Sequence, residues 1–477
     1  MIALSCTPTL YPQPVQAADL QAEACARDDT LLFPEAMRNL LCEAVNHVMT
    51  NHPEEFLSPD AFVRKSKKLS PVRLIDFIFS LQASNLPIQI ASFCGYDPDC
   101  QFANSTLSEA RNKIDADLFR EMFDYINMEL VKRGAFNEKN FLHPVYAIDG
   151  SVLHLEPFCK NEEYFAKTKS KNRRRAGAHL VALYNVDNKL FTDCEVQKLK
   201  GKNERKGALN LIAKIEEESI FVMDRGFHSF VLENKIQQMG HYYLIRLKKR
   251  DFYSLLQIKE DADIDPEIDI HKNLILTSSK KVSNKGDALH HFCHKKSSEI
   301  LDENGECKFS FRLLKIDMGV GLADPDKLEE RYQYFITNLP EEEYTLENIR
   351  AIYDSRWSVE KAFLELKYYV GLQAIHARKI NGVYQETWAR LILHNLISAC
   401  IMACERNRPA PKRPPKHETR INRKFAIEIL RKFLNYEILD EEYVVREIWR
   451  HTTPVKPERY FERHTLRKLD SNQHRMI

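Results

Sequence analysis

The segment VYAIDGSVLHL, residues 145–155, has the composition of a β-strand, because apolar and β-branched side chains surround a single acid, Asp149. Two similar segments follow, AHLVALYNV (178–186) and FTDCEVQKL (191–199), and Asp187-Asn188 marks a turn between them. We expect these three segments to form an antiparallel meander.

The next segments alternate between helix and strand. In order they are the helix NERKGALNLIAKI (203–215), the strand SIFVMDRGF (219–227), the helix SFVLENKIQQM (229–239) and the strand HYYLIRL (241–247). Three strands and a helix, followed by strand, helix and strand, is the element order of a ribonuclease-H-like fold, in which helices cover a mixed sheet. We therefore predict an α/β, ribonuclease-H-like domain over residues 141–405.

The rest of the chain divides into three parts by composition. Residues from about 250 to 339 contain short strand-like runs such as KFSFRLLKI, and a connection of this length predicts a β-rich insertion with its own structure. Residues 1–140 read as helical, and short helices near 88–95 and 105–114 fit either a DNA-binding helix-turn-helix or a small bundle with no partner. Residues 406–477 begin with a proline- and cation-rich linker and end in a small helical region.

Composition indicates a soluble globular protein of two or three domains, with 477 residues, 44% of them hydrophobic and 29% charged. The net charge is only +2, so affinity for nucleic acid must come from local clusters of cations. Eleven scattered cysteines without a CxxC pair favour reduced thiols. No secretory signal is recognisable, and polar residues interrupt the late apolar segment ARLILHNLISACIMAC, which is too short to span a bilayer. We expect a cytoplasmic, nucleoid-associated protein without membrane contact.

Two of the predicted strands carry an aspartate among apolar residues, Asp149 in AIDGS and Asp224 in VMDRG. A charge on a buried strand is costly unless it is paired, hydrogen-bonded or bound to a cation. Taken alone, either acid is most simply explained as a residue that caps a turn at the end of a strand. Gly150 and Gly226 permit such turns. In a ribonuclease-H-like sheet, however, the first and fourth strands are neighbours, so the two acids would repel each other unless a cation such as Mg²⁺ bound between them.

A third acid lies in AIYDSRWSVEKAFLELKYYV, residues 351–370. At about 100° per residue in an α-helix, four of its side chains fall on one stripe: Tyr353, Arg356, Glu360 and Lys367. We predict one continuous helix that begins after an N-cap at Thr345. An ordinary i,i+4 ion pair would explain Arg356 and Glu360 on their own.

Taken together, these residues resemble a bacterial DDE transposase of the insertion-sequence-four family. The family motif Y-x2-R-x3-E-x6-K matches the four residues of the stripe without a gap, and AIDGS and MDRGF resemble the surroundings of the family's first and second aspartates. The spacing from the second aspartate to the glutamate, 360 − 224 = 136, is long, as the β-strand insertion of this family implies. The resemblance covers residues from about 141 to 405.

The resemblance implies a mechanism with which the residue chemistry agrees. Asp149, Asp224 and Glu360 would hold two Mg²⁺ ions, with Mn²⁺ tolerated, for cleavage of a phosphodiester and transfer of the freed 3′-OH into target DNA. Tyr353, Arg356 and Lys367 would contact the DNA backbone. Arg225, next to the second aspartate, is a further candidate, and an ion pair within the sheet explains it equally well.

Two basic segments are additional candidates for DNA contact. The run KTKSKNRRRAG (167–177) contains six cations and no acid, and its candidate contacts are Lys169, Lys171, Arg173, Arg174 and Arg175. A second basic arm lies between residues 406 and 432. The alternative for both is a solvated loop. The cluster His290, His291, Cys293 and His294 is better explained by a surface or packing role than by metal binding, because ligands so close together on a strand cannot all face one ion.

The predicted partners are double-stranded DNA, comprising terminal inverted repeats and target DNA, and a second copy of the chain. Two alternatives stay open: a metal-dependent nuclease on the same fold, and a DNA-binding protein whose catalytic scaffold is idle. If a base is extruded during the reaction, a Phe or Tyr of the β-rich insertion must stack on it, because no Trp lies there.

Overall fold

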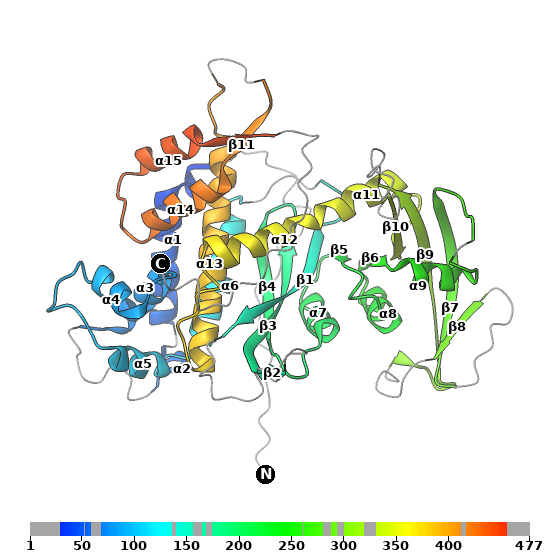
Figure 1. Cartoon of the computed structure of the whole chain (residues 1–477), viewed down its shortest axis with the longest axis horizontal. Helices are drawn as coiled ribbons and strands as arrows, with labels where there is room; N and C mark the ends of the chain where they lie inside the picture. The colour runs from blue at the N-terminus through cyan, green and yellow to red at the C-terminus, as the bar shows by residue number, and fades with distance from the viewer. Residues whose placement is uncertain are drawn as a thin grey trace, which may run out of the picture.

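The computed structural model describes residues 29–51, 53–58, 68–135, 140–155, 165–167, 174–260, 262–279, 288–292, 300–318, 331–411 and 416–455. The molecule is elongated: a body of helices occupies one end, and a large mixed sheet extends from it to the other end (Figure 1). The sheet has ten strands in the order β2-β3-β1-β5-β6-β10-β9-β7-β8, with β4 paired to β3.

The predicted meander and the two strands after it form the part of the sheet nearest the helical body. Its strands are β1 (Val145–His154), β3 (Arg174–Asn185), β4 (Leu190–Lys198), β5 (Ile220–Met223) and β6 (Tyr242–Leu247). β3 pairs antiparallel with both β1 and β4, whereas β5 pairs parallel with β1 and with β6. The predicted neighbourhood of the first and fourth strands is therefore confirmed, and the mixed sheet is consistent with a ribonuclease-H-like core.

The strands predicted between residues 250 and 339 are present and lengthen the same sheet. They are β7 (Ile268–Thr277), β8 (Ala288–Phe292), β9 (Glu306–Asp317) and β10 (Tyr332–Thr337). β10 pairs antiparallel with β6, and β9 pairs antiparallel with β10 and β7. The short strand β2 (Phe165–Lys167) pairs with β3 near the opposite edge.

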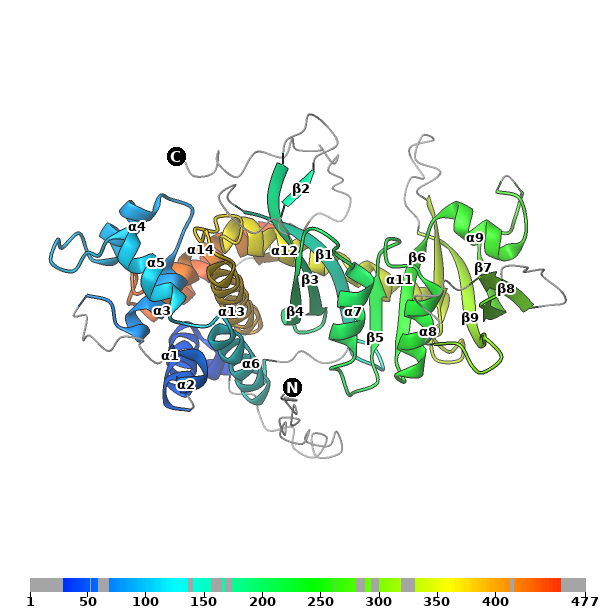
Figure 2. The same cartoon turned by 90° about the horizontal axis from the view of Figure 1, so that it is seen from below.

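Helices cover both faces of the sheet. One face packs against α7 (Glu204–Ile212), α8 (Phe230–Gln238) and α9 (Lys249–Leu256), and its core includes Ile148 and Met223. The opposite face packs against α11 (Leu346–Ser355) and α12 (Trp357–Leu364), and its core includes Ala147 and Val222. Figure 2 shows α7 and α8 together on one side of the strands.

The helical body is organised around one long helix, α13 (Ile380–Arg406). The larger helices around it are α1 (Pro34–Thr50), α3 (Pro71–Ser80), α6 (Asp117–Lys132), α14 (Arg423–Leu434) and α15 (Glu441–Arg450). The smaller elements are η1 (Asp29–Leu32), α2 (Pro53–Phe56), α4 (Leu86–Phe93), α5 (Asn104–Asn112), β11 (Thr419–Ile421) and β12 (Thr452–Pro454). N-terminal and C-terminal helices thus share one hydrophobic core with α13.

α13 corrects one expectation from the sequence. The sequence predicts that the apolar segment ARLILHNLISACIMAC is too short to span a bilayer. The whole helix, however, is long and apolar enough to cross a membrane by length and composition alone. The whole of its most apolar window is buried inside the molecule. Its hydrophobicity is therefore explained by its place at the centre of the helical body.

Candidate active site

The two strand aspartates lie side by side. In the parallel pairing of β1 and β5, Ile148 is opposite Met223, so Asp149 and Asp224 are the next residues on strands spaced by about 4.8 Å. Alternation along each strand places both acids on the face that α11 and α12 cover, because Ala147 and Val222 belong to that core. The sequence prediction that these acids are neighbours agrees with this arrangement.

A glycine that follows each aspartate fixes the direction of its carboxylate. Asp149 accepts a hydrogen bond of 2.8 Å from the amide of Gly150, and Asp224 accepts one of 2.8 Å from the amide of Gly226. A Cβ atom at Gly150 would lie 2.8 Å from Nε2 of His179, and one at Gly226 would lie 3.0 Å from Oδ1 of Asp224. Close packing therefore favours glycine at both positions, and more strongly at Gly150, where a Cβ atom would clash with His179.

Two residues of the neighbouring helices α7 and α8 hold the turn that carries Asp224. Arg205 of α7 donates a hydrogen bond of 3.1 Å to the carbonyl of Gly226. The fully buried Glu233 of α8 accepts hydrogen bonds from Nδ1 of His228 at 2.7 Å and from the amide of Ser229 at 3.0 Å. Burial lowers the pKa of His228, but the Glu233 carboxylate outweighs this effect and the pKa is raised.

Glu360 approaches the aspartates from α12, which packs on β1 (Figure 1). Its Oε1 atom lies 2.9 Å from Nη2 of Arg356. The Arg356 guanidinium is buried and lies over two aromatic rings, 5.3 Å from the centre of Tyr353 and 5.0 Å from that of Trp357. The glutamate is therefore held by an ion pair with the residue that precedes its helix.

The pKa of Asp149 reports how the three acids influence one another. Burial raises this pKa to about 6, the amide of Gly150 and the charge of Arg356 lower it, and the charges of Asp224 and Glu360 raise it further. As they stand, no three His, Cys, Asp or Glu side chains of the described ranges converge closely enough to hold a metal ion. Adjacent carboxylates that disfavour each other's ionisation nevertheless fit a divalent cation with a preference for oxygen ligands.

The helix that carries Glu360 is not a regular α-helix along its whole length, which corrects the prediction from its sequence. α11 begins after Thr345, which caps it as predicted, and ends at Ser355. At the junction the hydrogen bonds span three residues, from the amide of Arg356 to the carbonyl of Tyr353 and from the amide of Val359 to the carbonyl of Arg356. After α12 the chain forms a π-helix, η5 (Glu365–Tyr369), whose wider turn shifts Lys367 off the predicted stripe.

The residues predicted to contact DNA differ in exposure. Tyr353 is 1% exposed and packs edge-on against Phe335 of β10, with ring centres 4.7 Å apart. Its hydroxyl would have to become exposed to reach DNA, because this face of α11 packs on the sheet. Lys367 is half-buried on η5, whereas Arg225 is exposed and has no ion-pair partner among the described residues.

Several other candidates fall partly outside the description. Lys169, Lys171 and Arg173 lie outside the described residues, and for Arg174 and Arg175 only the backbone, at the start of β3, is described. Cys293 and His294 also lie outside it, while His291 packs edge-on against Phe230 at 4.9 Å. In the second basic arm, Arg406 pairs with Asp29 and Arg423 with Glu365, so two of its cations serve the fold.

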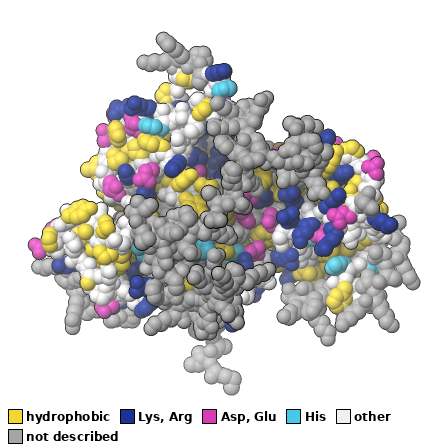
Figure 3. All heavy atoms as spheres, in the orientation of Figure 1, with side chains coloured by type: hydrophobic (Ala, Val, Ile, Leu, Met, Phe, Trp, Pro, Cys, Tyr) yellow, Lys and Arg dark blue, Asp and Glu magenta, His cyan; other side chains and the backbone are white. Residues whose placement is uncertain are grey.

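Sequence reasoning missed Arg246. In the pairing of β5 with β6, Met223 is opposite Ile245, which places Arg246 beside Asp224 on the same face of the sheet. The exposed cations Lys248, Lys249 and Arg250 follow it. Figure 3 shows Lys and Arg side chains gathered over this part of the sheet. The run RLKKR, without an acid, is the signal in the sequence that could have identified this position.

The match to a protein-family model agrees with this geometry. Residues 140–396, more than half of the chain, match the family model described as a transposase DDE domain. Among solved structures, the chain is similar to a piggyBac transposase in a synaptic complex with hairpin DNA, determined by cryo-EM, with 9% sequence identity, a TM-score of 0.43, and coverage of 89% of this chain and 86% of that one. No curated protein matches the sequence. The extent of the family match shows that the chain belongs to the transposases with a DDE domain.

Proposed function

We propose that this DDE transposase performs cut-and-paste transposition, in which it cleaves DNA at the ends of a transposon and transfers the freed 3′-OH into target DNA. The observation that carries the proposal is the side-by-side placement of Asp149 and Asp224, with Glu360 on the helix that crosses them. The ungapped Y-x2-R-x3-E-x6-K motif supports membership of the insertion-sequence-four family.

DDE transposases use divalent metals, and we assign the three acids as the residues that hold them. Two Mg²⁺ ions, when bound, would activate the attacking hydroxyl and stabilise the leaving oxygen. Within the chain, Asp149 and Asp224 present their oxygens from a rigid sheet, and the Gly150 and Gly226 amides fix their orientation. Glu360 is supplied by α12, which packs on β1 over the sheet face that carries both aspartates.

The cations near the acids supply a path for the DNA backbone. Arg246 lies next to Asp224 on the same face of the sheet, and the exposed Arg225 follows Asp224 in the sequence. Cations at these positions would neutralise phosphates that flank the bond to be cleaved. We assign double-stranded DNA as the substrate and a homodimer as the assembly that brings two transposon ends together.

A cleavage and strand-transfer assay tests the proposal, with DNA taken from the inverted repeats that flank the gene. Asp224→Asn and Glu360→Gln should each reduce cleavage and joining at least about 100-fold, because each removes a charged oxygen ligand. Binding of the same DNA, measured by fluorescence anisotropy, should change little. Glu347→Gln, which neutralises an exposed acid on α11, is the matched control and should retain activity.

The outcomes separate the alternatives. Cleavage without any joined product from pre-cleaved ends would indicate a nuclease on the same fold. DNA binding with no cleavage in Mg²⁺ or Mn²⁺ would indicate an idle scaffold. Full activity of Glu360→Gln would refute the assignment of the three acids.

A further inference from the structure

Arg356 lies among the acids of the candidate site, although a positively charged arginine cannot itself be a metal ligand. Its Nη2 atom is 2.9 Å from Glu360, and its charge also acts on Asp149. The Arg356 side chain is only 5% exposed, whereas that of Glu360 is 39% exposed. The buried partner is thus the cation, and the solvent-exposed partner is the acid.

The surroundings fix the guanidinium in position. The rings of Tyr353 and Trp357 lie on it, and cation–π contacts of this kind strengthen when the cation is removed from water. One of its donors, Nε, is buried and has no hydrogen-bond partner among the described residues. A guanidinium with a spare donor can bind a phosphate with two parallel hydrogen bonds.

We propose that Arg356 is an internal counter-ion that competes with the divalent metal for Glu360 and surrenders this acid when a DNA phosphate binds the guanidinium. The inference rests on the proposed function, because it takes Asp149, Asp224 and Glu360 as the metal-binding acids. It gives Arg356 a positioning role beyond contact with DNA: this residue sets how tightly the site binds metal before DNA arrives.

The backbone of α12 suits such an exchange. This helix of eight residues lies between the three-residue hydrogen bonds at Arg356 and the π-helix η5. A tight turn inside a helix often marks a hinge, and here the hinge would lie at Arg356, because the Glu365–Arg423 ion pair holds the start of η5 at the other end. Because the Arg356 charge and a divalent cation bound at Glu360 repel each other, a DNA phosphate that neutralises Arg356 favours metal binding at Glu360, and bound metal favours phosphate binding at Arg356.

Metal affinity in the absence of DNA is the direct readout. We would titrate the full chain with Mn²⁺ and measure the free ion by electron paramagnetic resonance. Arg356→Gln should bind Mn²⁺ about tenfold more tightly than the unmodified protein, the effect of releasing one charged hydrogen bond. Lys361→Gln removes an exposed cation from the same helix and should change the affinity less than about twofold, because screened charges interact weakly.

A second, conservative variant tests whether the change in Mn²⁺ affinity comes from the Arg356 side chain or from misfolding. Arg356→Lys keeps the charge but loses the planar fork, so it should raise the Mn²⁺ affinity by a smaller factor, about threefold. Circular dichroism and thermal melting confirm that each variant is folded. Addition of duplex DNA should increase the Mn²⁺ affinity of the unmodified protein by a larger factor than that of Arg356→Gln.

Asp224→Asn separates this inference from the proposed function. If Asp224→Asn loses Mn²⁺ binding while both Arg356 variants bind Mn²⁺ no more tightly than the unmodified protein, the counter-ion role is refuted and the metal site stands. If Asp224→Asn binds Mn²⁺ as tightly as the unmodified protein, the metal site itself is wrong, and the counter-ion role is refuted with it.

Discussion

At Asp149 the protein keeps a carboxyl group in surroundings that disfavour its charge. Burial raises the pKa to about 6 from an ordinary value of 3.8, so the ionised group costs the folded state about 3 kcal/mol at neutral pH. This cost is complete above about pH 6 and absent below about pH 4, where the acid is protonated in both states. A site that sacrifices stability in this way is typical of a function that needs the charge.

His228 gives a residue-scale prediction about pH. Its pKa is raised in the folded state through Glu233, so protonation stabilises the fold below the unfolded pKa of about 6.5, and this contribution disappears as pH rises through the folded value. His228→Gln should therefore lower the free energy of unfolding by about 1–2 kcal/mol at pH 6 and by less at pH 9. Urea unfolding at the two pH values measures the difference.

An exposed histidine supplies the control for this prediction. His271 lies 3.5 Å from Glu341 with a side chain 63% exposed, and His271→Gln should cost nearly the same small amount at both pH values. An equal loss at pH 6 and pH 9 for His228→Gln would show that the Glu233 pair acts only as a neutral hydrogen bond.

Sequence reasoning at this scale succeeded where the signal was local. Asp149 and Asp224 stand out because acids are rare among apolar strand residues, and the order of elements predicts that their strands are neighbours. Arg246 could not be placed, because its position beside Asp224 depends on the register of β5 and β6, which the sequence does not state. The burial of Tyr353 depends in the same way on which face of α11 meets β10.

At the scale of the element, the first residue of the π-helix after α12 forms a largely buried ion pair with α14. Glu365 accepts hydrogen bonds from Nε and Nη2 of Arg423 at 2.6 and 2.7 Å, and His394 of α13 lies 3.7 Å away. Burial opposes ionisation of Glu365, but Arg423 and His394 outweigh it and lower the pKa to about 2. The pair joins η5 to α14, so it also limits how α12 can end.

We expect Arg423→Gln to destabilise the protein by about 2 kcal/mol, because it leaves the Glu365 carboxylate buried with only His394 beside it. The free energy of unfolding in urea measures this loss. Arg420→Gln is the matched control: Arg420 is 66% exposed and pairs with the equally exposed Glu418, so the change should cost less than about 0.5 kcal/mol. Equal effects of the two substitutions would contradict a structural role for the Glu365 pair.

This element shows why the predicted four-turn helix was only partly right. Helical spacing in residues 351–370 correctly indicates helix, and Thr345 correctly indicates its start. The first residue of the π-helix, Glu365, binds Arg423, which is 58 residues away along the chain. A local pattern cannot reveal a contact at that distance along the chain.

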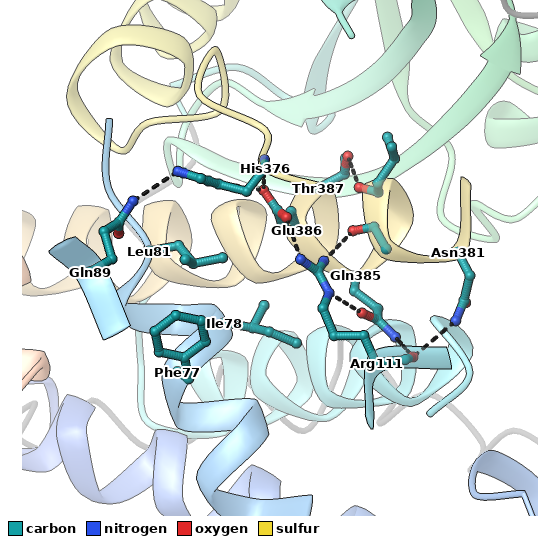
Figure 4. A network of polar contacts seen from close by, with 12 residues as sticks. Phe77, Ile78, Leu81, Gln89, Arg111, His376, Asn381, Gln385, Glu386 and Thr387 are labelled. Atoms are coloured by element: carbon teal, nitrogen blue, oxygen red, sulfur yellow. Dashed lines mark hydrogen bonds and ion pairs between the residues drawn. The ribbon is translucent and has the colours of Figure 1, made fainter. Parts of the chain in front are cut away.

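At the scale of the whole molecule, α13 joins parts that composition separates. A boundary at residue 140 divides the N-terminal helices from the sheet, yet Figure 4 shows Arg111 of α5 bound to Gln385 and Glu386 of α13. The same network continues through His376 to Gln89 of α4.

A second contact ties α3 to α13. The fully buried Arg390 donates hydrogen bonds to carbonyls at the end of α3, including those of Phe79 and Leu81. Such networks are costly to break once buried, because each unpaired charge then lacks solvent. The charged residues within the apolar sequence of α13 are therefore explained by their hydrogen bonds to other helices. The sequence of α13 alone does not show these partners.

This architecture predicts that the N-terminal helices do not fold without α13. A fragment of residues 29–135 would expose the apolar faces of α1, α3 and α6 that α13 covers, and Arg111 would lose its partners. Burial of these faces supplies most of the driving force at roughly 25 cal/mol per Å², so the fragment should show no cooperative thermal transition by circular dichroism. In the full chain, near-ultraviolet and far-ultraviolet signals of the helices and sheet should unfold together. A fragment that melts cooperatively, with the helix content it has in the full chain, would instead support an independent N-terminal domain, as composition alone suggests.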